Sequence, residues 1–175
     1  MITEIYKIEQ IGKGFLAVMA KPVAGEWIEE EIFNLANQGV NQIVSLLEDA
    51  ETFEVGLQDE KQLSEVNGME FISFPIKDRG LPKTTSEFSF FTRNLYDQIS
   101  SGKNTVIHCR AGIGRSGLVA AGILLHYGFK PDAAFELISS RRRVRVPDTE
   151  EQRNWLKENC SLIVGNFSNF NNRKL

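Results

Sequence analysis

The sequence predicts an α/β fold, with a central, mostly parallel sheet of four to five strands and helices on both faces. Short apolar runs rich in β-branched and aromatic residues alternate with longer segments of helical periodicity. Strands that alternate with helices tend to pair in parallel, because each helix carries the chain back across the sheet. The length of 175 residues suits a single domain, which we expect over residues 1–165, followed by a C-terminal tail over 166–175.

The first part of the chain holds two expected strand–helix pairs. The run FLAVM at 15–19 predicts a strand, and apolar side chains recur at helical spacing over 26–37 until a glycine follows. The apolar run QIVSLL at 42–47 is bounded by polar turns and predicts a buried strand. A weaker amphipathic pattern over 53–66 predicts a second helix that ends at Asn-Gly.

The middle of the chain repeats this order. The segment FISFPI at 71–76 alternates and is rich in aromatic and β-branched residues, which predicts a third strand. A loop over 77–84 contains Asp, Gly and Pro, and Thr84 or Thr85 then caps a helix that runs to about Ser100. The run NTVIHC at 104–109 predicts the fourth strand.

The last part begins with a tight, glycine-bearing loop at 110–114, and three helices follow. The first is apolar and covers 115–127, the second covers 131–142 with proline at its first position, and the third opens at 147–149. Ligands of parallel sheets bind beyond the carboxyl ends of the strands. The loops at 77–83 and 110–114 both leave strands at that end, so we expect the functional site there.

Composition and charge exclude several classes of function. Lys and Arg number 20 against 23 Asp and Glu, and the net charge of −3 argues against a dedicated nucleic-acid-binding protein. Two cysteines are too few for a disulfide framework, and the N-terminus lacks the basic and apolar regions of a secretory signal. The most apolar stretch, 117–129, is too short to cross a bilayer. We therefore expect a cytoplasmic monomer with no membrane span and no nucleic-acid partner.

One segment carries most of the chemical information, the residues HCRAGIGRSG at 108–117. An apolar strand delivers Cys109 into a short loop whose glycines let successive backbone N–H groups point inward, next to the start of a helix. Such a loop favours an anion of phosphate size, and Arg115 can add a bidentate guanidinium. The same positive field should lower the pKa of the Cys109 thiol below its free value of about 8.5. A thiolate beneath a bound phosphate is placed for in-line attack, and Ser116 can hydrogen-bond the sulfur when it later leaves.

Three other interpretations fit this segment less well. Its glycines match the G-x-G-x-x-G pattern of dinucleotide sites, but about 20 residues further on the chain predicts a helix instead of a strand that ends in an acid. A Walker loop needs Gly-Lys-Ser/Thr, and this chain has Gly-Arg-Ser. A free cysteine is often a buried structural residue, but two glycines, an arginine and a helix start around Cys109 favour a reactive one.

The segment resembles the phosphate-binding signature of the cysteine-based protein tyrosine and dual-specificity phosphatases, His-Cys-x5-Arg-Ser/Thr-Gly, over ten contiguous residues. The resemblance is to the compact dual-specificity branch, extends as architecture from about 15 to 155, and implies a phosphatase-type phosphate loop between a strand and a helix. It implies Cys109 as nucleophile, Arg115 as phosphate clamp and Ser116 as the hydroxyl that assists turnover, with no metal and no cofactor. The residues implied to bind the phosphate are Arg110, Ala111, Gly112, Ile113, Gly114 and Arg115.

The resemblance also implies a general acid in a loop upstream of the cysteine, because a leaving alkoxide or phenolate needs a proton. Asp78 is the favoured candidate, since it follows a predicted strand in a loop with glycine and proline. Asp78 in a simple Asp-Arg-Gly turn is the structural alternative. Asp97 lies within a predicted helix and Asp49 lies far upstream, so both are weaker candidates. Large tyrosine phosphatases read Trp-Pro-Asp here, which leaves the extent of loop closure open.

Further residues receive supporting parts. His108 either braces the loop and tunes the thiolate or is a satisfied core histidine. Classical members place water-positioning glutamines in Gln-Thr-x-x-Gln, and the corresponding text DTEEQ at 148–152 implies Gln152 as an assistant, with a helix N-cap as the alternative. The arginine-rich run at 141–145 is interpreted as a solvated helix end that also attracts dianionic substrates. Cys160 is either structural or a redox partner of the nucleophile.

The expected function is metal-independent hydrolysis of phosphotyrosine, and also phosphoserine or phosphothreonine, in proteins through a phosphocysteine intermediate. The chain lacks the Asn-Arg-Tyr loop that deepens the pocket of large tyrosine-specific members, and its Pro-Ile-x-Asp stretch at 75–78 resembles the cyclin-dependent-kinase-associated branch. A phosphoinositide or another small-molecule phosphate is the alternative substrate. Two other classes stay open: a non-catalytic phosphate-binding module, and a rhodanese-type sulfur or arsenate enzyme, which needs no acid in a separate loop.

Overall fold

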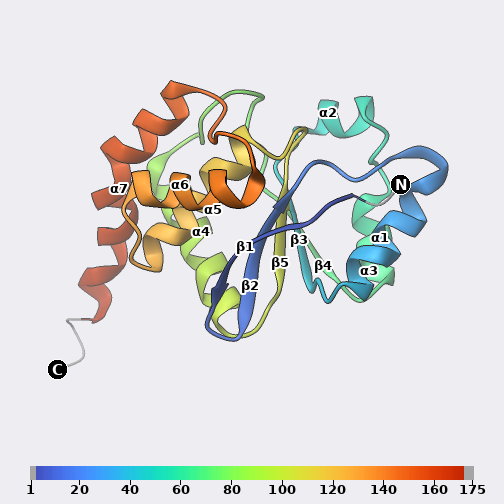
Figure 1. The fold of residues 1–175 in the computed structure, drawn as a ribbon, viewed down its shortest axis with the longest axis horizontal. Coiled ribbons are helices and arrows are strands. Elements are labelled where there is room, and N and C mark those ends of the chain that lie inside the picture. Colours follow the sequence, from blue (N-terminus) through green and yellow to red (C-terminus); the bar gives the residue numbers. More distant parts are fainter. Residues whose placement is uncertain (1–2, 172–175) are drawn as a thin grey trace.

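The chain folds around one five-stranded sheet whose strands stand in the order β1-β2-β5-β3-β4 (Figure 1). The structure is a computed structural model that describes residues 3–171, with side chains described up to Gly165. The strands are β1 (Tyr6–Ile11), β2 (Gly14–Met19), β3 (Gln42–Ser45), β4 (Glu70–Ser73) and β5 (Thr105–His108). β1 pairs antiparallel with β2, and every other pair in the sheet is parallel. The predicted mostly parallel sheet is thus confirmed.

Helices cover both faces of this sheet, as predicted (Figure 1). One face carries α1 (Ile28–Asn37), which follows the short 3-10 helix η1 (Gly25–Trp27), and α3 (Glu60–Val66). The other face carries α4 (Thr85–Ser100), α5 (Gly114–His126), α6 (Pro131–Arg142) and α7 (Glu150–Asn171). The short α2 (Asp49–Glu54) lies beyond the carboxyl end of β3. Thr84 caps α4 by accepting a hydrogen bond from the Glu87 backbone, as its sequence position predicts.

The central strand β5 is buried on both sides and divides the core into two clusters. Val106 packs into the cluster beneath α1, and Ile107 packs into the larger cluster beneath α4 to α7. Because alternate residues of a strand point to opposite faces, the two neighbouring side chains anchor β5 from both sides. The end of β5, from which the glycine-bearing loop leaves, is therefore held firmly at the centre of the sheet.

Two elements differ from the sequence-based expectations. Strand β1 was not predicted, because a bulge between Lys7 and Glu9 shifts the register and places the buried Ile8 and Ile11 three positions apart, which hides the alternation of a strand. The helix expected over 53–66 is wrong: the structure has α2 and α3, separated by a turn at Gly56 whose φ is +74°.

The C-terminal helix α7 continues into the segment predicted as a tail. Its backbone is helical to Asn171, whereas 172–175 lie outside the described residues. Within the described part of the chain, no helix combines the length and the apolar character needed to span a bilayer.

Candidate active site

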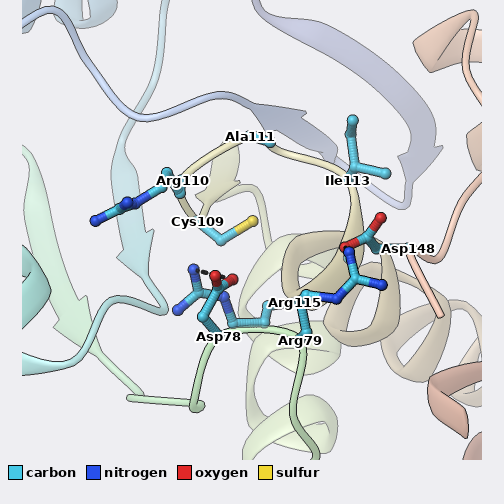
Figure 2. Close-up of a pocket in the computed structure, with 9 residues that line it drawn as sticks. Asp78, Arg79, Cys109, Arg110, Ala111, Ile113, Arg115 and Asp148 are labelled. Atoms are coloured by element: carbon cyan, nitrogen blue, oxygen red, sulfur yellow. Dashed lines mark ion pairs between the residues drawn. The ribbon is translucent and has the colours of Figure 1, made fainter.

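The loop between β5 and α5 forms the floor of a pocket of about 190 Å³ at the carboxyl edge of the sheet (Figure 2). The pocket is lined by Asp78, Arg79, Cys109, Arg110, Ala111, Ile113, Gly114, Arg115 and Asp148. The loop at 77–83 and the segment before α7 supply the other walls. The two loops that the sequence singled out therefore meet at one place, as predicted.

Close packing against β2 fixes the course of this loop. The backbone of Gly112 has a φ of +69°, and a Cβ atom there would lie 2.3 Å from the carbonyl oxygen of Met19. The backbone N–H of Lys21 donates to the carbonyl oxygen of Arg110 at 3.2 Å. Only glycine can take the position at 112, because both the positive φ and the close approach exclude a side chain.

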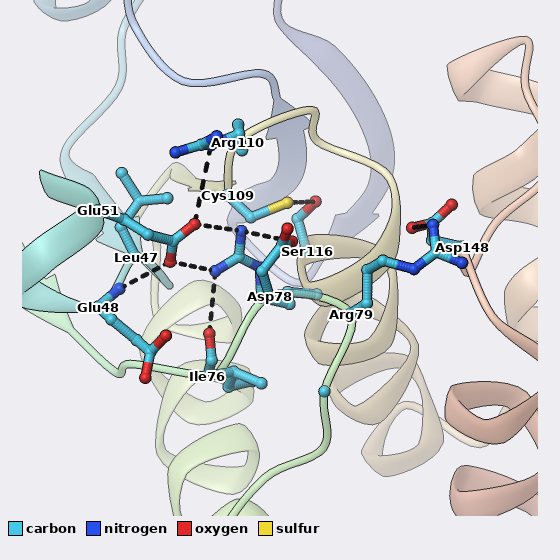
Figure 3. A network of polar contacts seen from close by, with 12 residues as sticks. Leu47, Glu48, Glu51, Ile76, Asp78, Arg79, Cys109, Arg110, Ser116 and Asp148 are labelled. Carbon is cyan, nitrogen blue, oxygen red and sulfur yellow. Dashed lines mark hydrogen bonds and ion pairs between the residues drawn. The ribbon is translucent and has the colours of Figure 1, made fainter. Parts of the chain in front are cut away.

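Cys109 lies at the bottom of the pocket with 3% of its surface exposed. Its Sγ is 3.4 Å from the Ser116 hydroxyl, and Figure 3 shows the two side chains facing each other. Burial raises the pKa of the Cys109 thiol. Hydrogen bonds from the Ser116 hydroxyl and amide, the charge of Arg115 and the Ile113 amide together lower this pKa by more than burial raises it, so the net shift is downward. The surroundings thus favour a thiolate.

Arg115 is buried in the first turn of α5, with its guanidinium held from three directions. Two of its nitrogens donate to the Glu51 carboxylate at 2.6 and 3.0 Å, and one also donates to the carbonyl oxygen of Ile76 at 2.9 Å. Asp78 Oδ1 lies 3.0 Å from the terminal nitrogen that does not bond Ile76. The planar fork of an arginine is fixed in orientation by such bidentate bonding.

Glu51 was missed by the sequence analysis. It belongs to α2 and also lies 3.8 Å from Arg110 (Figure 3). The Arg110 guanidinium also pairs with Glu54 at 3.1 Å. Burial raises the pKa of Glu51, but the hydrogen bonds and charge of Arg115 outweigh that effect and hold the pKa below its usual value. The available signal was its position just after the buried strand β3, which ends at the same edge as β5.

Asp78 stands at the mouth of the pocket, with 59% of its side chain exposed. The loop that carries it is tied at two points, to Asp148 just before α7 and to Gln152 in the first turn of α7. Arg79, with a φ of +56°, pairs with Asp148 at 3.0 Å, and the buried Gln152 amide donates to the carbonyl oxygen of Gly80 at 3.1 Å. Gln152 therefore contacts the loop without lining the pocket, whereas Asp148 lines it.

Arg142 is an exception within the arginine-rich run predicted as a solvated helix end. The other arginines of the run, Arg141, Arg143 and Arg145, are exposed, but Arg142 is half-buried behind the loop. It donates to the carbonyl oxygens of Gly112 at 3.0 Å and Ala111 at 2.8 Å, and its guanidinium lies 4.2 Å from the ring centre of Tyr6. The prediction is thus wrong for this one residue, because the sequence could not show that α6 passes behind the loop.

The remaining candidates lie away from the pocket wall. Asp97 pairs with Arg93 along α4, and Asp49 opens α2. Cys160 lines a separate groove near the start of α6. His108 is fully buried beneath the loop. Among the side chains that the structure describes, no cluster of three or more His, Cys, Asp or Glu is arranged to hold a metal ion.

The arrangement suits nucleophilic displacement at a tetrahedral anion. A buried sulfur with a lowered pKa, a fixed guanidinium and a helix N-terminus converge on the pocket floor, and an exposed carboxyl group faces them from the mouth. The first three groups stabilise negative charge on the bound anion, and the carboxyl group is placed to exchange a proton with it.

Sequence comparison identifies relatives of this chain. The family described as "PTP-SAK: Swiss Army Knife protein, DSP-PTPase phosphatase domain" matches residues 6–160. "Putative tyrosine phosphatase 067L" of Invertebrate iridescent virus 3 is 33% identical over 91 residues, 49% of this chain and 38% of the viral protein. The similarly named 197R of Invertebrate iridescent virus 6 is 33% identical over 102 residues, 55% of this chain and 35% of that protein. The chain thus spans little more than a third of these two relatives.

Structural comparison finds the same architecture in solved phosphatases. Kinase-associated phosphatase superposes with a TM-score of 0.84 at 20% identity, over 94% of this chain and 97% of its own. Tk-PTP in its active form gives 0.71 at 26% identity, over 87% and 95%. PTPMT1, which is also solved in complex with PI(5)P, gives 0.75 at 19% identity, over 95% and 99%. The fold is common to all of them.

Proposed function

Because the chain belongs to the family of DSP-PTPase phosphatase domains, we propose that it hydrolyses phosphomonoesters through a phosphocysteine intermediate on Cys109. The observation that carries the proposal is the pocket itself. It joins a thiol of lowered pKa, the buried Arg115 guanidinium and the exposed Asp78 carboxyl group within one cavity of about 190 Å³.

In the first step, the Cys109 thiolate attacks the phosphorus atom in line with the leaving oxygen. The S–P bond forms as the P–O bond breaks, and the electron pair of that bond goes to the leaving oxygen, which takes a proton from Asp78. Arg115 and the amides of residues 110–115 bind the equatorial oxygens, on which negative charge is spread in the transition state.

In the second step, water attacks the phosphorus of the phosphocysteine while the Asp78 carboxylate accepts its proton. The P–O bond to water forms, the S–P bond breaks and the sulfur leaves as a thiolate. The Ser116 hydroxyl, 3.4 Å from Sγ, stabilises that thiolate by donating a hydrogen bond. Gln152 assists by holding the Asp78 loop through the carbonyl oxygen of Gly80.

We assign phosphoproteins as the substrate class, with phosphotyrosine and also phosphoserine or phosphothreonine as the target groups. The two arginines at the rim, Arg79 and Arg110, are each paired with carboxylates, Asp148 on one side and Glu51 with Glu54 on the other. Their charge is therefore balanced, which favours a substrate with one phosphate over a polyphosphorylated headgroup. Phosphoinositides remain the alternative substrate, because PTPMT1, which shares the fold, is solved with PI(5)P.

The deciding experiment compares Cys109→Ser with Cys160→Ser in phosphate release from p-nitrophenyl phosphate in the presence of a chelator. Loss of turnover is expected in the first variant and wild-type turnover in the second, because Cys160 lies in a separate groove. Phosphopeptides, phosphoinositides and nucleotides then rank the substrates. A phosphate-binding module would release no phosphate from any of them, and normal turnover by Cys109→Ser would exclude this nucleophile.

A further inference from the structure

A buried acid–base pair lies beneath the phosphate loop, outside the pocket. His108 is the last residue of β5 and is 0% exposed, and Glu60 at the start of α3 is 1% exposed. Glu60 Oε1 lies 2.9 Å from His108 Nε2, while the other ring nitrogen lies 3.4 Å from the carbonyl oxygen of Cys109. The imidazole thus stands between a buried carboxylate and the backbone of the proposed nucleophile.

A contribution to folding stability does not by itself explain why Glu60 and His108 are buried as an ion pair. Two charges removed from water lose hydration energy that their mutual attraction often fails to restore, so apolar residues at such sites are commonly as stable or more stable. Glu60 Oε1 and His108 Nε2 also have no well-aligned hydrogen bond besides their ion-pair contact. A buried ion pair that costs hydration energy and lies directly next to the proposed nucleophile indicates a functional role for the pair.

The groups whose charge acts on His108 are Glu60 and Cys109. In the sheet, the neighbours of His108 are Met19 on β2 and Ser45 on β3, neither of which is charged. Helix α3 contributes Glu60, and the phosphate loop contributes the Cys109 thiol. Arg115, whose charge acts on Cys109, is itself paired with Glu51 and Asp78.

We propose, on the basis of the function proposed above, that Glu60 is a positioning residue for the nucleophile. Its carboxylate holds the His108 imidazole in place and in the protonated form, so that a second cation besides Arg115 lies next to the Cys109 thiolate. Glu60 itself touches neither the substrate nor the sulfur and acts through His108.

The electrostatic balance at His108 agrees with this geometry. Burial lowers the pKa of His108, but the charge and contact of Glu60, together with the charge of Cys109, raise it by more, so the net shift is upward. An imidazolium and a thiolate favour each other's charged form. Removal of the Glu60 charge therefore lowers the pKa of His108, and the imidazole loses its proton. Without that positive charge beside the sulfur, the pKa of Cys109 rises.

The test reads the Cys109 thiolate directly, by the pH dependence of iodoacetamide alkylation in a Cys160→Ser background. Glu60→Gln is expected to move the alkylation midpoint upward by about one pH unit. Glu31→Gln is the matched control, because Glu31 is also a buried glutamate, 2% exposed, but it lies on α1 and accepts hydrogen bonds from the Thr3 backbone N–H instead of contacting His108. The control is expected to keep the wild-type midpoint.

A double variant shows whether Glu60 acts through His108. His108→Gln alone and together with Glu60→Gln should shift the midpoint equally, because residues that act as a unit are non-additive. A Glu60→Gln midpoint equal to that of the control would overturn the proposal, and so would additive shifts.

Nitrogen NMR of the two histidine rings provides a readout that requires no variant. His108 is expected to show an imidazolium at pH 7, and His126, whose pKa is lowered to about 4, supplies a neutral reference in the same spectrum. A neutral His108 ring in the wild type would overturn the proposal even if Glu60→Gln does not fold. Neither the alkylation midpoint nor the NMR spectrum depends on turnover. If the protein releases no phosphate but gives the expected results in both measurements, the proposed function is excluded and the role of the Glu60–His108 pair is still supported.

Discussion

Two carboxylates share Arg115, and they differ in burial. Glu51 is largely buried and bonds two guanidinium nitrogens, so it fixes the direction in which the arginine points. Asp78 contacts one nitrogen from the exposed mouth of the pocket. A phosphate that enters the pocket can replace the exposed contact and leave the buried one in place. In the mechanism proposed above, Asp78 is thereby freed to serve the leaving group while Arg115 keeps its orientation.

Asp78→Asn is expected to slow hydrolysis in proportion to the need of the leaving group for a proton. Phenyl and alkyl phosphates should lose about 10²-fold or more in kcat, the usual contribution of a general acid, whereas p-nitrophenyl phosphate should lose far less because its leaving group is a stable anion. Asp97→Asn is the control, since Asp97 pairs with Arg93 on α4 and should leave both rates unchanged. An equal loss for all leaving groups would contradict the assignment of Asp78.

How much of the site could be predicted depends on how its residues are distributed along the chain. Cys109, Arg115 and Ser116 lie in one contiguous segment, and Asp78 follows a strand that is recognisable by its pattern. Glu51 and Arg142 come from separate helices, and they reach the loop only because of how α2 and α6 pack. No periodicity or motif encodes that packing, so supporting residues of this kind emerge only from the structure.

Helices α4 and α5 approach each other closely at Gly122. A Cβ atom there would lie 2.6 Å from two ring atoms of Phe88 and 3.0 Å from the Thr92 methyl group. Phe88 is fully buried in the larger core cluster, so it has little room to move. The phosphate loop precedes α5, and its position therefore depends on this contact.

The same substitution at two helical glycines is expected to have opposite effects on stability. Gly122→Ala should destabilise the fold by about 1–3 kcal/mol, because the added methyl group overpacks the α4–α5 contact. Gly165→Ala on α7 should stabilise it by about 0.5–1 kcal/mol, because no described atom outside the adjoining turns of the helix lies within 4 Å of the added Cβ and alanine is the better helix former. Urea denaturation of both variants measures the difference. A Gly122→Ala variant as stable as the wild type would show that α5 can shift without cost.

At the scale of the whole molecule, folding shifts the pKa values of the two histidines in opposite directions. Burial, followed by the nearby charge of Arg93, lowers the pKa of His126 to about 4. The unfolded chain therefore binds a proton at His126 that the folded chain rejects between pH 4 and about 6.5, and folding stability rises with pH across that window. His108 has a raised pKa, so its contribution is present below about pH 6.5 and is lost as the pH rises through the raised value.

Replacement of His126 should flatten the acid side of the stability profile. In urea titrations between pH 4.5 and 6.5, His126→Gln is expected to lower the slope of the unfolding free energy by up to about 1.4 kcal/mol per pH unit, which corresponds to one proton. His108→Gln should change the slope above pH 6.5 instead. If the wild type and His126→Gln have parallel profiles in the acid window, His126 does not carry the depressed pKa.

The position of Arg142 behind the phosphate loop has a consequence for the thermodynamics of binding. In a planar peptide unit the carbonyl and the N–H point in opposite directions, so the bonds from Arg142 to the Ala111 and Gly112 carbonyls direct the amides of the following residues, Gly112 and Ile113, to the other side. The loop thus has its dipoles aligned before any anion arrives. For the phosphate binding proposed above, association then needs little rearrangement of the backbone, and Arg142 is expected to contribute to affinity by preorganisation without contacting the substrate.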